Sequence, residues 1–532
     1  MVIRRRKSFP ASFLFFKVRF RLRAYNRIIT REKKPKEEQD MKNRWMNQAF
    51  AVCLAGALAA AGMTACASQT TTEETAVVET KTQESEAETA TKNYLSKEDI
   101  VVETTYENSA DGEHAIEVDG EEATYTNIGV TKTGDSDLGD EADFYGDNSA
   151  VFSTNGATTT ITDSLIETDG THANAVYSYG EGTTVTISDS VIETSGNCSG
   201  GLMTTGGGTM IANNLTINTS GNSSAAIRSD RGGGTVTVTD GYYKTTGTGS
   251  PVIYSTADIT VNDAYMESTA SQAVVVEGKN SVTLNDCEVV ADNNTKNSDN
   301  SDYYQAVMIY QSMSGDADDG TSAFAMDGGS ITNANGDIFF VTNTQANIEL
   351  DGVEIVNNDT SGVFLRASAA GWGSDGSNGG QVNLNATNQD IDGDMVVDEV
   401  SKLNLYLSEN SSYTGAINSD VEAGEVYVEL TDGATWTLTG DSYVTALTCD
   451  ADSINLNGHT LYVDGVAYTE GTAVSGEAVE FTATSSGQGM PGDGQAPDGQ
   501  APDGQKPDGN GPSGDGNEPP AKPEGENGKK NN

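Results

Sequence analysis

Residues 184–192 read Thr-Val-Thr-Ile-Ser-Asp-Ser-Val-Ile, and residues 209–217 read Thr-Met-Ile-Ala-Asn-Asn-Leu-Thr-Ile. In each stretch two apolar residues lie two positions apart, and a third follows seven positions after the first. Residues two apart point to the same face of a strand. The step of five to the third residue requires a corner, and Asp189 and Asn214 are residue types that favour turns. Each stretch therefore predicts two short strands that meet at a corner.

The same pattern occurs ten times along the chain. In the most regular part, successive copies start at positions 159, 185, 210, 236, 259 and 282. A nearly constant spacing in the range of about 20–50 residues is typical of a solenoid, in which each repeat forms one coil. The copies are Ala123/Tyr125/Val130, Thr159/Ile161/Ile166, Val185/Ile187/Ile192, Met210/Ala212/Ile217, Val236/Val238/Tyr243, Ile259/Val261/Met266, Val282/Leu284/Val289, Phe324/Met326/Ile331, Ile348/Leu350/Ile355 and Ile454/Leu456/Leu461.

A further short apolar segment follows several copies and completes the predicted coil. These segments are residues 175–177, 252–254, 274–276, 307–309 and 363–365. Thr, Val and Ile dominate the strands, and no long segment has helical periodicity. We therefore predict an all-β domain over residues 92–485, a right-handed parallel β-helix of about a dozen coils. The period becomes less regular after about residue 400, so we expect an end cap there and another over residues 92–120.

Over roughly residues 115–480 this repeat resembles the pectin-lyase-like β-helix superfamily, and more closely its adhesin-like members on bacterial surfaces. Residues 411–418 also resemble the last coils of such adhesin-like proteins. The resemblance implies the fold. It leaves the function open, because the superfamily includes lyases, hydrolases, esterases and proteins that only bind.

The N-terminal part predicts export and lipid anchoring. Met41 begins a short basic region, an apolar stretch follows, and Met63-Thr64-Ala65-Cys66 resembles a lipobox. We therefore expect residues 41–65 to be a lipoprotein signal peptide and Cys66 to carry the lipid that holds the protein outside the cytoplasm. Residues 1–40 do not fit this scheme, and we interpret them as translated upstream sequence. Residues 66–91, rich in Thr and Glu, predict a disordered tether.

The other end and the charge also restrict the interpretation. Residues 486–532 are rich in Pro, Gly and Asp and predict a disordered tail. Residues 1–65 hold 15 of the 30 basic residues and 4 of the 79 acidic ones, so the rest of the chain has 15 basic and 75 acidic residues. This balance argues against nucleic acid and anionic lipid surfaces as partners. The only membrane contact that we expect is the N-terminal lipid, and we expect a monomer.

The residues that commonly carry catalysis are sparse, and we recognise no catalytic set. The three histidines, His114, His172 and His459, match no zinc or catalytic spacing, so we expect surface or turn positions for them. Cys53 would leave with the signal peptide. Cys198, Cys287 and Cys449 lie on distant coils, so we expect them to be free thiols in or near the core.

One dense basic cluster occurs in the coils, at Arg228 and Arg231. Arg228 lies as far beyond the start of its copy, at position 210, as Tyr254 lies beyond the start of the next copy, at position 236. The two side chains should therefore stack one coil apart, within reach of a cation–π contact. A sugar-binding site and a surface charge pair are both compatible with this cluster.

Two insertions interrupt the repeat, near residues 290–323 and at residues 367–380. Such insertions leave one face of a solenoid and often form its binding surface. They carry Tyr303, Tyr304 and Trp372, whose rings can stack on sugars or pack back on the coils. Two acidic loops offer carboxylates for calcium, although neither completes an EF-hand loop; they contain Asp316 and Asp318, and Asp390, Asp392 and Asp394.

These observations together favour a lipid-anchored surface protein that acts as an adhesin, a carbohydrate-binding protein or a spacer. Its expected partners are polysaccharides or glycans of host or cell surfaces. The alternative is a polysaccharide lyase or glycoside hydrolase on the same scaffold, which would need convergent acid, base and charge-neutralising groups. No cofactor is expected apart from calcium at the acidic loops.

Overall fold

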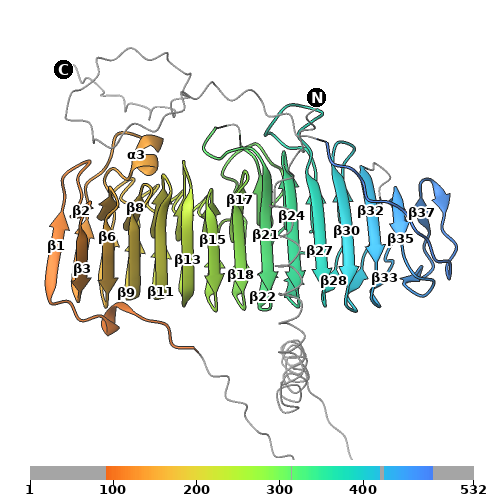
Figure 1. The fold of residues 1–532 in the computed structure, drawn as a ribbon, viewed down its shortest axis with the longest axis horizontal. Coiled ribbons are helices and arrows are strands. Elements are labelled where there is room, and N and C mark those ends of the chain that lie inside the picture. Colours follow the sequence, from red (N-terminus) through yellow and green to blue (C-terminus); the bar gives the residue numbers. More distant parts are fainter. Residues whose placement is uncertain (1–91, 313, 420–423, 483–532) are drawn as a thin grey trace, which may run out of the picture. The chain divides into compact units, whose positions relative to one another are not determined.

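The computed structural model describes residues 92–482, except residue 313 and residues 420–423. The expectations for residues 1–40, 41–65, 66–91 and 486–532 all lie outside these residues. Within the described part the chain winds into parallel coils that follow one another in sequence order (Figure 1). The predicted parallel β-helix is confirmed. Each regular coil contributes strands to three faces.

Faces one and two belong largely to one 20-stranded sheet, and four strands of the C-terminal coils continue face two as a separate sheet. Three long strands run across both faces: β9 (Thr184–Thr194), β11 (Gly208–Thr219) and β13 (Gly234–Thr245). The other strands of face one are β3 (Glu122–Thr126), β6 (Thr158–Thr162), β15 (Asp258–Asn262), β18 (Ser281–Asn285), β21 (Thr321–Asp327), β24 (Gln345–Asp351), β27 (Gln381–Thr387), β30 (Lys402–Ser408), β32 (Glu425–Leu430) and β35 (Ala446–Thr448). Those of face two are β1 (Thr104–Asn108), β4 (Ile128–Lys132), β7 (Leu165–Thr168), β16 (Tyr265–Ser268), β19 (Glu288–Ala291), β22 (Ser330–Asn333), β25 (Glu354–Asn357), β28 (Asp390–Asp392), β31 (Ser412–Thr414), β33 (Thr435–Thr437) and β36 (Ile454–Asn455).

Face three is an 11-stranded parallel sheet, followed by a small sheet at the C-terminal end. Its strands are β2 (Ile116–Asp119), β5 (Val151–Thr154), β8 (Val176–Tyr179), β10 (Leu202–Thr205), β12 (Ile227–Ser229), β14 (Ile253–Ser255), β17 (Val274–Glu277), β20 (Gln305–Tyr310), β23 (Asp337–Thr342), β26 (Leu365–Ala367) and β29 (Met395–Val397). The small sheet consists of β34 (Ser442–Val444), β37 (Leu461–Val463) and β38 (Val466–Ala467).

The corners between faces one and two form where the sequence places Asp or Asn. Asp189, Asn214, Asp240 and Asp263 all have positive φ, between 49° and 61°. Asn and Asp tolerate this left-handed conformation better than most residues. The amide of Asn214 also donates a hydrogen bond to Asp189 Oδ1 on the preceding coil, at 2.7 Å. The corner residues therefore both turn the chain and link neighbouring coils.

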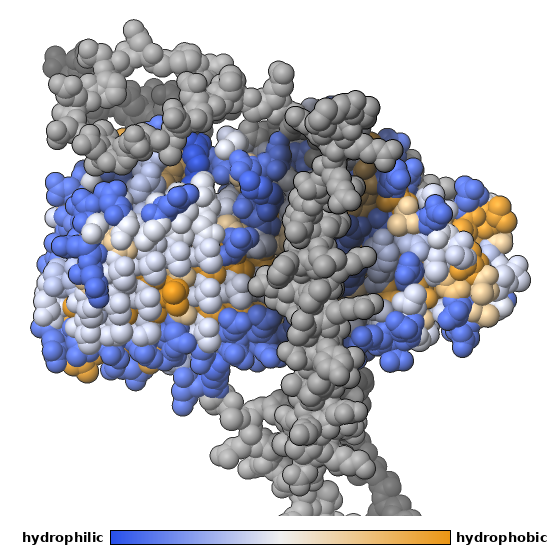
Figure 2. Space-filling view, viewed as in Figure 1, coloured by the Kyte–Doolittle hydropathy of each residue, from blue (hydrophilic) through white to orange (hydrophobic). Residues whose placement is uncertain are grey.

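The core is a continuous apolar column inside the coils. The repeat residues that were expected to point inward, such as Ile187, Ile217 and Val261, are fully buried in one cluster. Small and polar residues cover most of the visible surface of the coils, with narrower bands of apolar residues (Figure 2). The alternation of buried and exposed residues along the strands thus produces the fold.

The terminal segments at both ends of the described chain contact the faces of the coils. Residues 92–99, which include the short helix η1 (Lys97–Asp99), lie along face two, where Tyr94 packs on Tyr242 at 5.1 Å and Lys97 pairs with Glu167 at 2.7 Å. At the other end coils continue past residue 400 to β37, although their strands on faces two and three belong to separate small sheets. The Thr482 N–H donates to Gln381 Oε1 on face one at 2.7 Å. Both terminal segments therefore run along the sides of the coils.

Among the described residues one α-helix, α3 (Asp140–Tyr145), lies between β4 and β5 in a loop beside face three (Figure 1). Within the described residues no helix is long and apolar enough to cross a membrane. The short helix α3 covers part of the outer side of face three.

Candidate functional site

The outer side of face three collects large side chains that are mostly hidden from solvent. Strand alternation turns every second residue of each strand outward, while the residues between them enter the core. These outward residues stack in register from coil to coil and form what we call the outer column. It contains Tyr177, Met203, Arg228, Tyr254, Val275, Met308, Phe340 and Arg366.

Two coverings hide the outer column. The first is α3: the Tyr177 hydroxyl donates to the Asp143 carbonyl, and Thr205 Oγ1 donates to the Phe144 carbonyl at 2.8 Å. The second is made by loop 292–304, loop 311–320 and loop 368–380, the insertions that the broken repeat predicted. The Gly371 N–H donates to the Asn300 carbonyl at 2.7 Å, so the first and third loops meet over the column.

A cleft of about 120 Å³ opens between loop 292–304 and the outer column. The sequence-predicted residues Tyr254, Tyr303, Tyr304 and Trp372 all line it, together with Tyr310. Residues of the coils and of both insertions, which are far apart in the sequence, thus share one cleft. We call it the aromatic cleft.

The rings of the aromatic cleft are held by contacts on their inner sides. Trp372 meets Tyr310 edge to face, with ring centroids 5.2 Å apart. Tyr303 is 42% exposed, and the guanidinium of Arg366 lies 4.0 Å from its ring centroid. The rings of Trp372 and Tyr303 therefore pack on side chains of the coils and also line the cleft.

Polar groups are present in the same cleft. Gln272, Asn293 and Gln305 contribute amide side chains to its lining. Gln305 is 1% exposed, and its Oε1 atom has no hydrogen-bond partner in the described structure. A buried amide oxygen without a partner is unfavourable, so Gln305 is a ready acceptor for a ligand hydroxyl.

A buried carboxyl lies beneath the aromatic cleft. Glu277 is 1% exposed, and its Oε2 atom accepts hydrogen bonds from the hydroxyls of Tyr254 and Tyr310, the latter at 3.0 Å. Burial raises the pKa of both tyrosines well above the usual value, and the nearby Glu277 adds to the increase. The hydroxyls are therefore protonated donors that hold the rings in place.

Arg228 pairs in register with Tyr254, as the spacing predicted, but its guanidinium has other partners. Arg228 Nη2 lies 3.1 Å from Oδ2 of Asp143 in α3 and 2.9 Å from Oδ2 of Asp230. Among the described residues the cation–π contacts involve Lys92, Arg231 and Arg366 instead. The expected contact with Tyr254 is thus replaced by two buried ion pairs, because α3 brings in a carboxylate that the spacing could not predict.

Burial and charge shift the acids of this cluster in opposite directions. Burial by itself raises the pKa of Asp143, but Arg228 and His172 outweigh it and hold the pKa below its usual range. Burial raises the pKa of Asp230 to about 6, against the opposing effect of Arg228. Arg228 itself has a raised pKa, because the two carboxylates outweigh its burial. The guanidinium is therefore paired with two protein carboxylates through Nη2, whereas its buried Nη1 atom has no hydrogen-bond partner among the described residues.

Arg231 lies at the surface between the two coverings. Its guanidinium lies 3.9 Å from the ring centroid of Phe144 in α3, and its Nη2 lies 2.8 Å from Oδ1 of Asp316 in loop 311–320. Its side chain is 45% exposed. Arg231 thus links the coverings, whereas Arg228 beneath it is buried.

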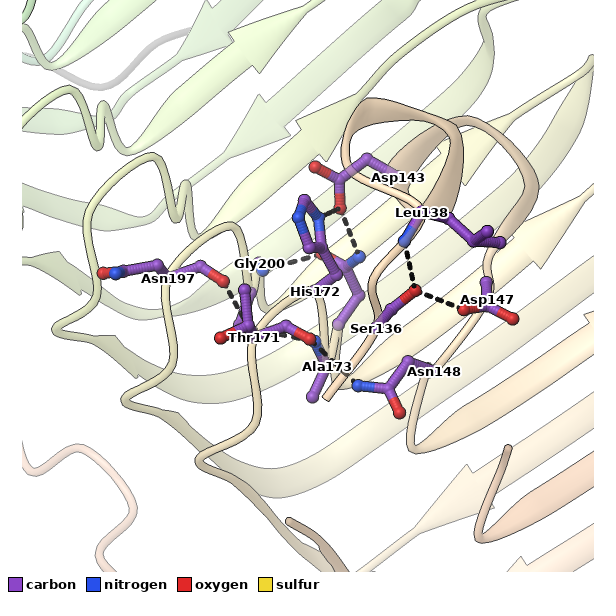
Figure 3. A network of polar contacts seen from close by, with 12 residues as sticks. Ser136, Leu138, Asp143, Asp147, Asn148, Thr171, His172, Ala173, Asn197 and Gly200 are labelled. Carbon is purple, nitrogen blue, oxygen red and sulfur yellow. Dashed lines mark hydrogen bonds and ion pairs between the residues drawn. The ribbon is translucent and has the colours of Figure 1, made fainter. Parts of the chain in front are cut away.

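The second group of interest lies where α3 meets the turns of face three (Figure 3). His172 is at a turn with φ 57°, as expected of a turn position, but it is only 7% exposed. Its Nδ1 atom lies 3.2 Å from Asp143 Oδ1, and Cys198 lies nearby. Sequence reasoning missed this cluster because α3 was not recognised. The sequence signal for this insertion is the wide gap between the copies that start at positions 123 and 159. The copies that follow, at 185 and 210, are more closely spaced.

Among the described residues, the carboxylates of the proposed calcium ligands form no group of three within 4.8 Å of one another. Asp316 pairs with Arg231, and Asp318 pairs with Lys279 at 2.6 Å. Asp390 accepts from Ser412 at 2.5 Å, Asp394 accepts from the Ala416 N–H at 2.8 Å, and Asp392 is exposed. In the described residues, the single group of three or more His, Cys, Asp or Glu donors within 4.8 Å of one another is Asp143, His172 and Cys198.

The remaining histidines and cysteines have structural surroundings. His114 stacks on Phe152 at 4.5 Å, with Nδ1 3.0 Å from the Ser149 carbonyl. Cys198, Cys287 and Cys449 are free thiols, as predicted, and the last two are buried. None of these contacts joins the aromatic cleft.

A larger groove of about 540 Å³ follows the edge of face two. Its lining is hydroxyl-rich and includes Glu167, Glu193 and Lys244. These charges already have partners: Lys97 pairs with both glutamates, and Lys244 pairs with Glu267 at 3.1 Å. The groove contains no aromatic ring, so the aromatic cleft is the better candidate for ligand recognition despite its smaller volume.

The lipidation candidate Cys66 lies outside the described residues. Comparison of the whole chain with known proteins finds no matching family model, no matching curated protein and no matching solved structure. The geometry of face three is therefore the basis for a functional proposal.

Proposed function

We propose that this protein binds neutral carbohydrate chains through the aromatic cleft, from a position at the cell surface where a lipid on Cys66 anchors it. The observation that carries the proposal is the convergence of Tyr254, Tyr303, Tyr304 and Trp372 on one cleft. Aromatic faces offer an apolar surface for the C–H face of a sugar ring, and the amides beside them can bond its hydroxyls.

A neutral glycan fits this cleft better than an acidic one. The single basic residue in its lining is Lys296, whose Nζ lies 2.8 Å from Asp302 Oδ1. Arg366, which lies against the ring of Tyr303, pairs with Asp337 at 2.6 Å. The chain after residue 65 also carries 75 acidic residues against 15 basic ones, so it repels polyanions over a distance set by the salt concentration.

The surroundings of Arg228 favour binding over cleavage of a uronic acid chain. A lyase needs a cation that neutralises the substrate carboxylate and a base beside it. Arg228 is buried with Asp143 and Asp230, and Arg231 is engaged by Asp316. A lyase or hydrolase on this scaffold stays the second candidate, and the experiment below separates it from a binding protein.

The test uses the purified protein and a panel of neutral and acidic polysaccharides, with retention and the release of new sugar ends followed together. We expect retention by a neutral polysaccharide without new ends. Trp372→Ala and Tyr303→Ala should each weaken retention about tenfold, the effect of losing a contact worth about 1.4 kcal/mol. Tyr443→Ala is the matched control. Tyr443 stacks on Tyr462, with ring centroids 4.8 Å apart, and neither residue lines the cleft.

Three outcomes would contradict the proposal. Release of new sugar ends by the wild type would show an enzyme. Preferential retention by acidic chains would refute the ligand class. Equal retention by the wild type, Trp372→Ala and Tyr303→Ala would place recognition elsewhere on the protein.

A further inference from the structure

The cluster beneath α3 begins with a column of side chains at one turn of successive coils. His172, Cys198 and Ser223 occupy the same position of this turn, with φ of 57°, 54° and 54°. The His172 N–H donates to the Asn197 carbonyl at 3.0 Å, and the Cys198 N–H donates to the Asn222 carbonyl at 2.8 Å. These bonds hold the turns one coil apart, so the imidazole and the thiol are neighbours.

The residue types in this column are unusual for their backbone. All non-glycine residues with positive φ in the described structure are Asn or Asp, apart from His172, Cys198, Ser223 and Glu409. The left-handed conformation costs roughly 1–2 kcal/mol for most residues and is easier for Asn and Asp. His172 and Cys198, on consecutive coils, therefore occupy turn positions where Asn would fit the backbone better.

The insertion that contains α3 brings a carboxylate to this column. Asp143 is 2% exposed and His172 is 7% exposed. A carboxylate oxygen of Asp143, a ring nitrogen of His172 and Sγ of Cys198 all lie within 4.8 Å of one another. Three different segments of the chain thus direct one oxygen, one nitrogen and one sulfur donor to a common point.

Asp143 and His172 form a close contact whose spacing also suits two ligands of one ion. His172 Nδ1 lies 3.2 Å from Asp143 Oδ1 (Figure 3), but the buried Nδ1 atom makes no hydrogen bond. Two ligands of one tetrahedral Zn²⁺, with bonds of about 2.0–2.2 Å, lie roughly 3.3–3.6 Å apart. The pair is therefore arranged for an ion between or beside its atoms.

We propose that Asp143, His172 and Cys198 form a Zn²⁺ site with three protein ligands. The mixture of carboxylate, imidazole and thiolate donors suits Zn²⁺, which is borderline soft, better than Ca²⁺ or Mg²⁺, which prefer oxygen. Three protein ligands leave the fourth position to water or another small ligand. Cys198 is partly exposed, which gives an ion access from solvent.

The charges of the cluster also accommodate the ion. Asp143 and Asp230 together face the single guanidinium of Arg228, which leaves one net negative charge when both acids are ionised. Binding of Zn²⁺ with ionisation of the Cys198 thiol adds one positive charge and brings the sum to zero. A buried group of charges is least unfavourable when it is neutral overall.

The surroundings hold the carboxylate ligand in position. Asn174 Nδ2 donates to Asp143 Oδ1 at 3.0 Å, and Asn174 Oδ1 accepts from the Gly200 N–H at 2.7 Å. Asp143 Oδ2 faces Arg228. Hydrogen bonds of this kind to metal ligands typically raise metal affinity 10- to 100-fold. The ion would tie the α3 insertion to two coils and fix one covering of the outer column.

The experiment is a titration of chelator-treated, reduced full-length protein with Co²⁺, a spectroscopic substitute for Zn²⁺, in excess Ca²⁺. Calcium suppresses weak cation binding to the acidic surface. We expect one equivalent of Co²⁺ to produce a thiolate-to-cobalt charge-transfer absorption, and one equivalent of Zn²⁺ to remove it. Carboxylates alone cannot produce this absorption, so it reports on a cysteine ligand.

Variants identify the ligands. Cys198→Ser should abolish the absorption, whereas Cys287→Ser, which removes a buried thiol elsewhere, should preserve it. His172→Asn suits the left-handed backbone and should weaken Co²⁺ binding at least tenfold. Asn174→Ala should weaken it about 10- to 100-fold while retaining the absorption. Circular dichroism checks that each variant is folded, and His172→Asn and Asn174→Ala keep the test decisive if Cys198→Ser does not fold.

The proposal is overturned if the wild type gives no charge-transfer absorption. It is equally overturned if the absorption persists in Cys198→Ser or disappears in Cys287→Ser. It is also overturned if His172→Asn binds Co²⁺ with the same affinity as the wild type. A zinc-dependent rise of the melting temperature in the wild type that vanishes in Cys198→Ser would be the supporting result in stability measurements.

Discussion

Arg228 and Tyr254 are register partners on adjacent coils, yet their polar groups diverge. The guanidinium of Arg228 lies 3.1 Å from Asp143 and 2.9 Å from Asp230, whereas the Tyr254 hydroxyl bonds to Glu277. The outer column of face three is therefore divided between an ionic cluster beneath α3 and an aromatic cleft beneath the loops. The two parts can be tested independently.

The ionic cluster should depend on Arg228. Arg228→Met leaves two buried carboxylates without their cation, and we expect the free energy of unfolding to fall by about 3–5 kcal/mol. Denaturant unfolding at neutral pH measures this. Arg231→Gln is the control: it removes an ion pair with a 45% exposed arginine, which contributes about 0–1 kcal/mol. Equal effects of the two substitutions would contradict the cluster.

The sequence predicted the scaffold because a period of two within strands and a repeat of nearly constant length determine which side chains enter the core. The corners at Asp189, Asn214 and Asp240 were predictable for the same local reason, since Asx residues favour positive φ. Such properties depend on neighbours in sequence or on the regular length of each coil.

The site was only partly predictable. Tyr303, Tyr304 and Trp372 were identified because they are aromatic residues in polar insertions, and the structure brings them together with Tyr254. The partners of Arg228 were not identified, because Asp143 reaches it from a helix that lies several coils earlier in the chain. The path of an insertion over a coil is set by tertiary packing, which no periodicity encodes.

A ladder of glycines should be essential for the stacking of coils. A Cβ atom added at Gly196 would lie 1.9 Å from the Gly170 carbonyl oxygen, and one at Gly221 would lie 1.8 Å from that of Gly196. Backbone atoms of the preceding coil cannot yield, so we expect Gly196→Ala to lower stability by about 3 kcal/mol or to prevent folding. Thermal unfolding measures the loss.

Gly440→Ala is the matched control for this ladder, because its added Cβ would lie 3.2 Å from the Ala416 side chain rather than against backbone. We expect a change below about 1 kcal/mol. If Gly196→Ala were as stable as Gly440→Ala, the close approach of the turns would be refuted.

Asp230 should make stability depend on pH. Its pKa in the folded protein is raised to about 6 from 3.8, so the folded state holds the proton more tightly than the unfolded state. The resulting contribution to stability is complete below about pH 4 and is lost as the pH rises through 6. Asp230→Asn removes this loss, so its stability relative to wild type should increase by roughly 2–3 kcal/mol between pH 4 and pH 7.

Denaturant unfolding at several pH values measures this difference. Asp302→Asn, which removes an exposed carboxyl paired with Lys296, is the control and should not reproduce the rise. A difference between Asp230→Asn and wild type that stays constant from pH 4 to pH 7 would contradict the raised pKa.

The hydroxyls of Tyr254 and Tyr310 should act through Glu277. Both donate to its Oε2 atom, and Glu277 Oε1 has no hydrogen-bond partner in the described structure. Hydrogen bonds to a charged group contribute about 1.5–3 kcal/mol, so Tyr310→Phe should lower the free energy of unfolding by this amount. Tyr254→Phe should do the same and should also loosen one wall of the aromatic cleft.

A double-mutant cycle with Glu277→Gln tests whether the carboxyl is the cause. In the Glu277→Gln background, Tyr310→Phe should lower stability by less than about 1 kcal/mol, because an uncharged amide oxygen replaces the carboxylate as acceptor. Unfolding of the four proteins in denaturant gives the coupling energy. Additive effects would mean that Tyr310 contributes through ring packing alone, and the cleft would then owe its rigidity to the contact with Trp372 at 5.2 Å.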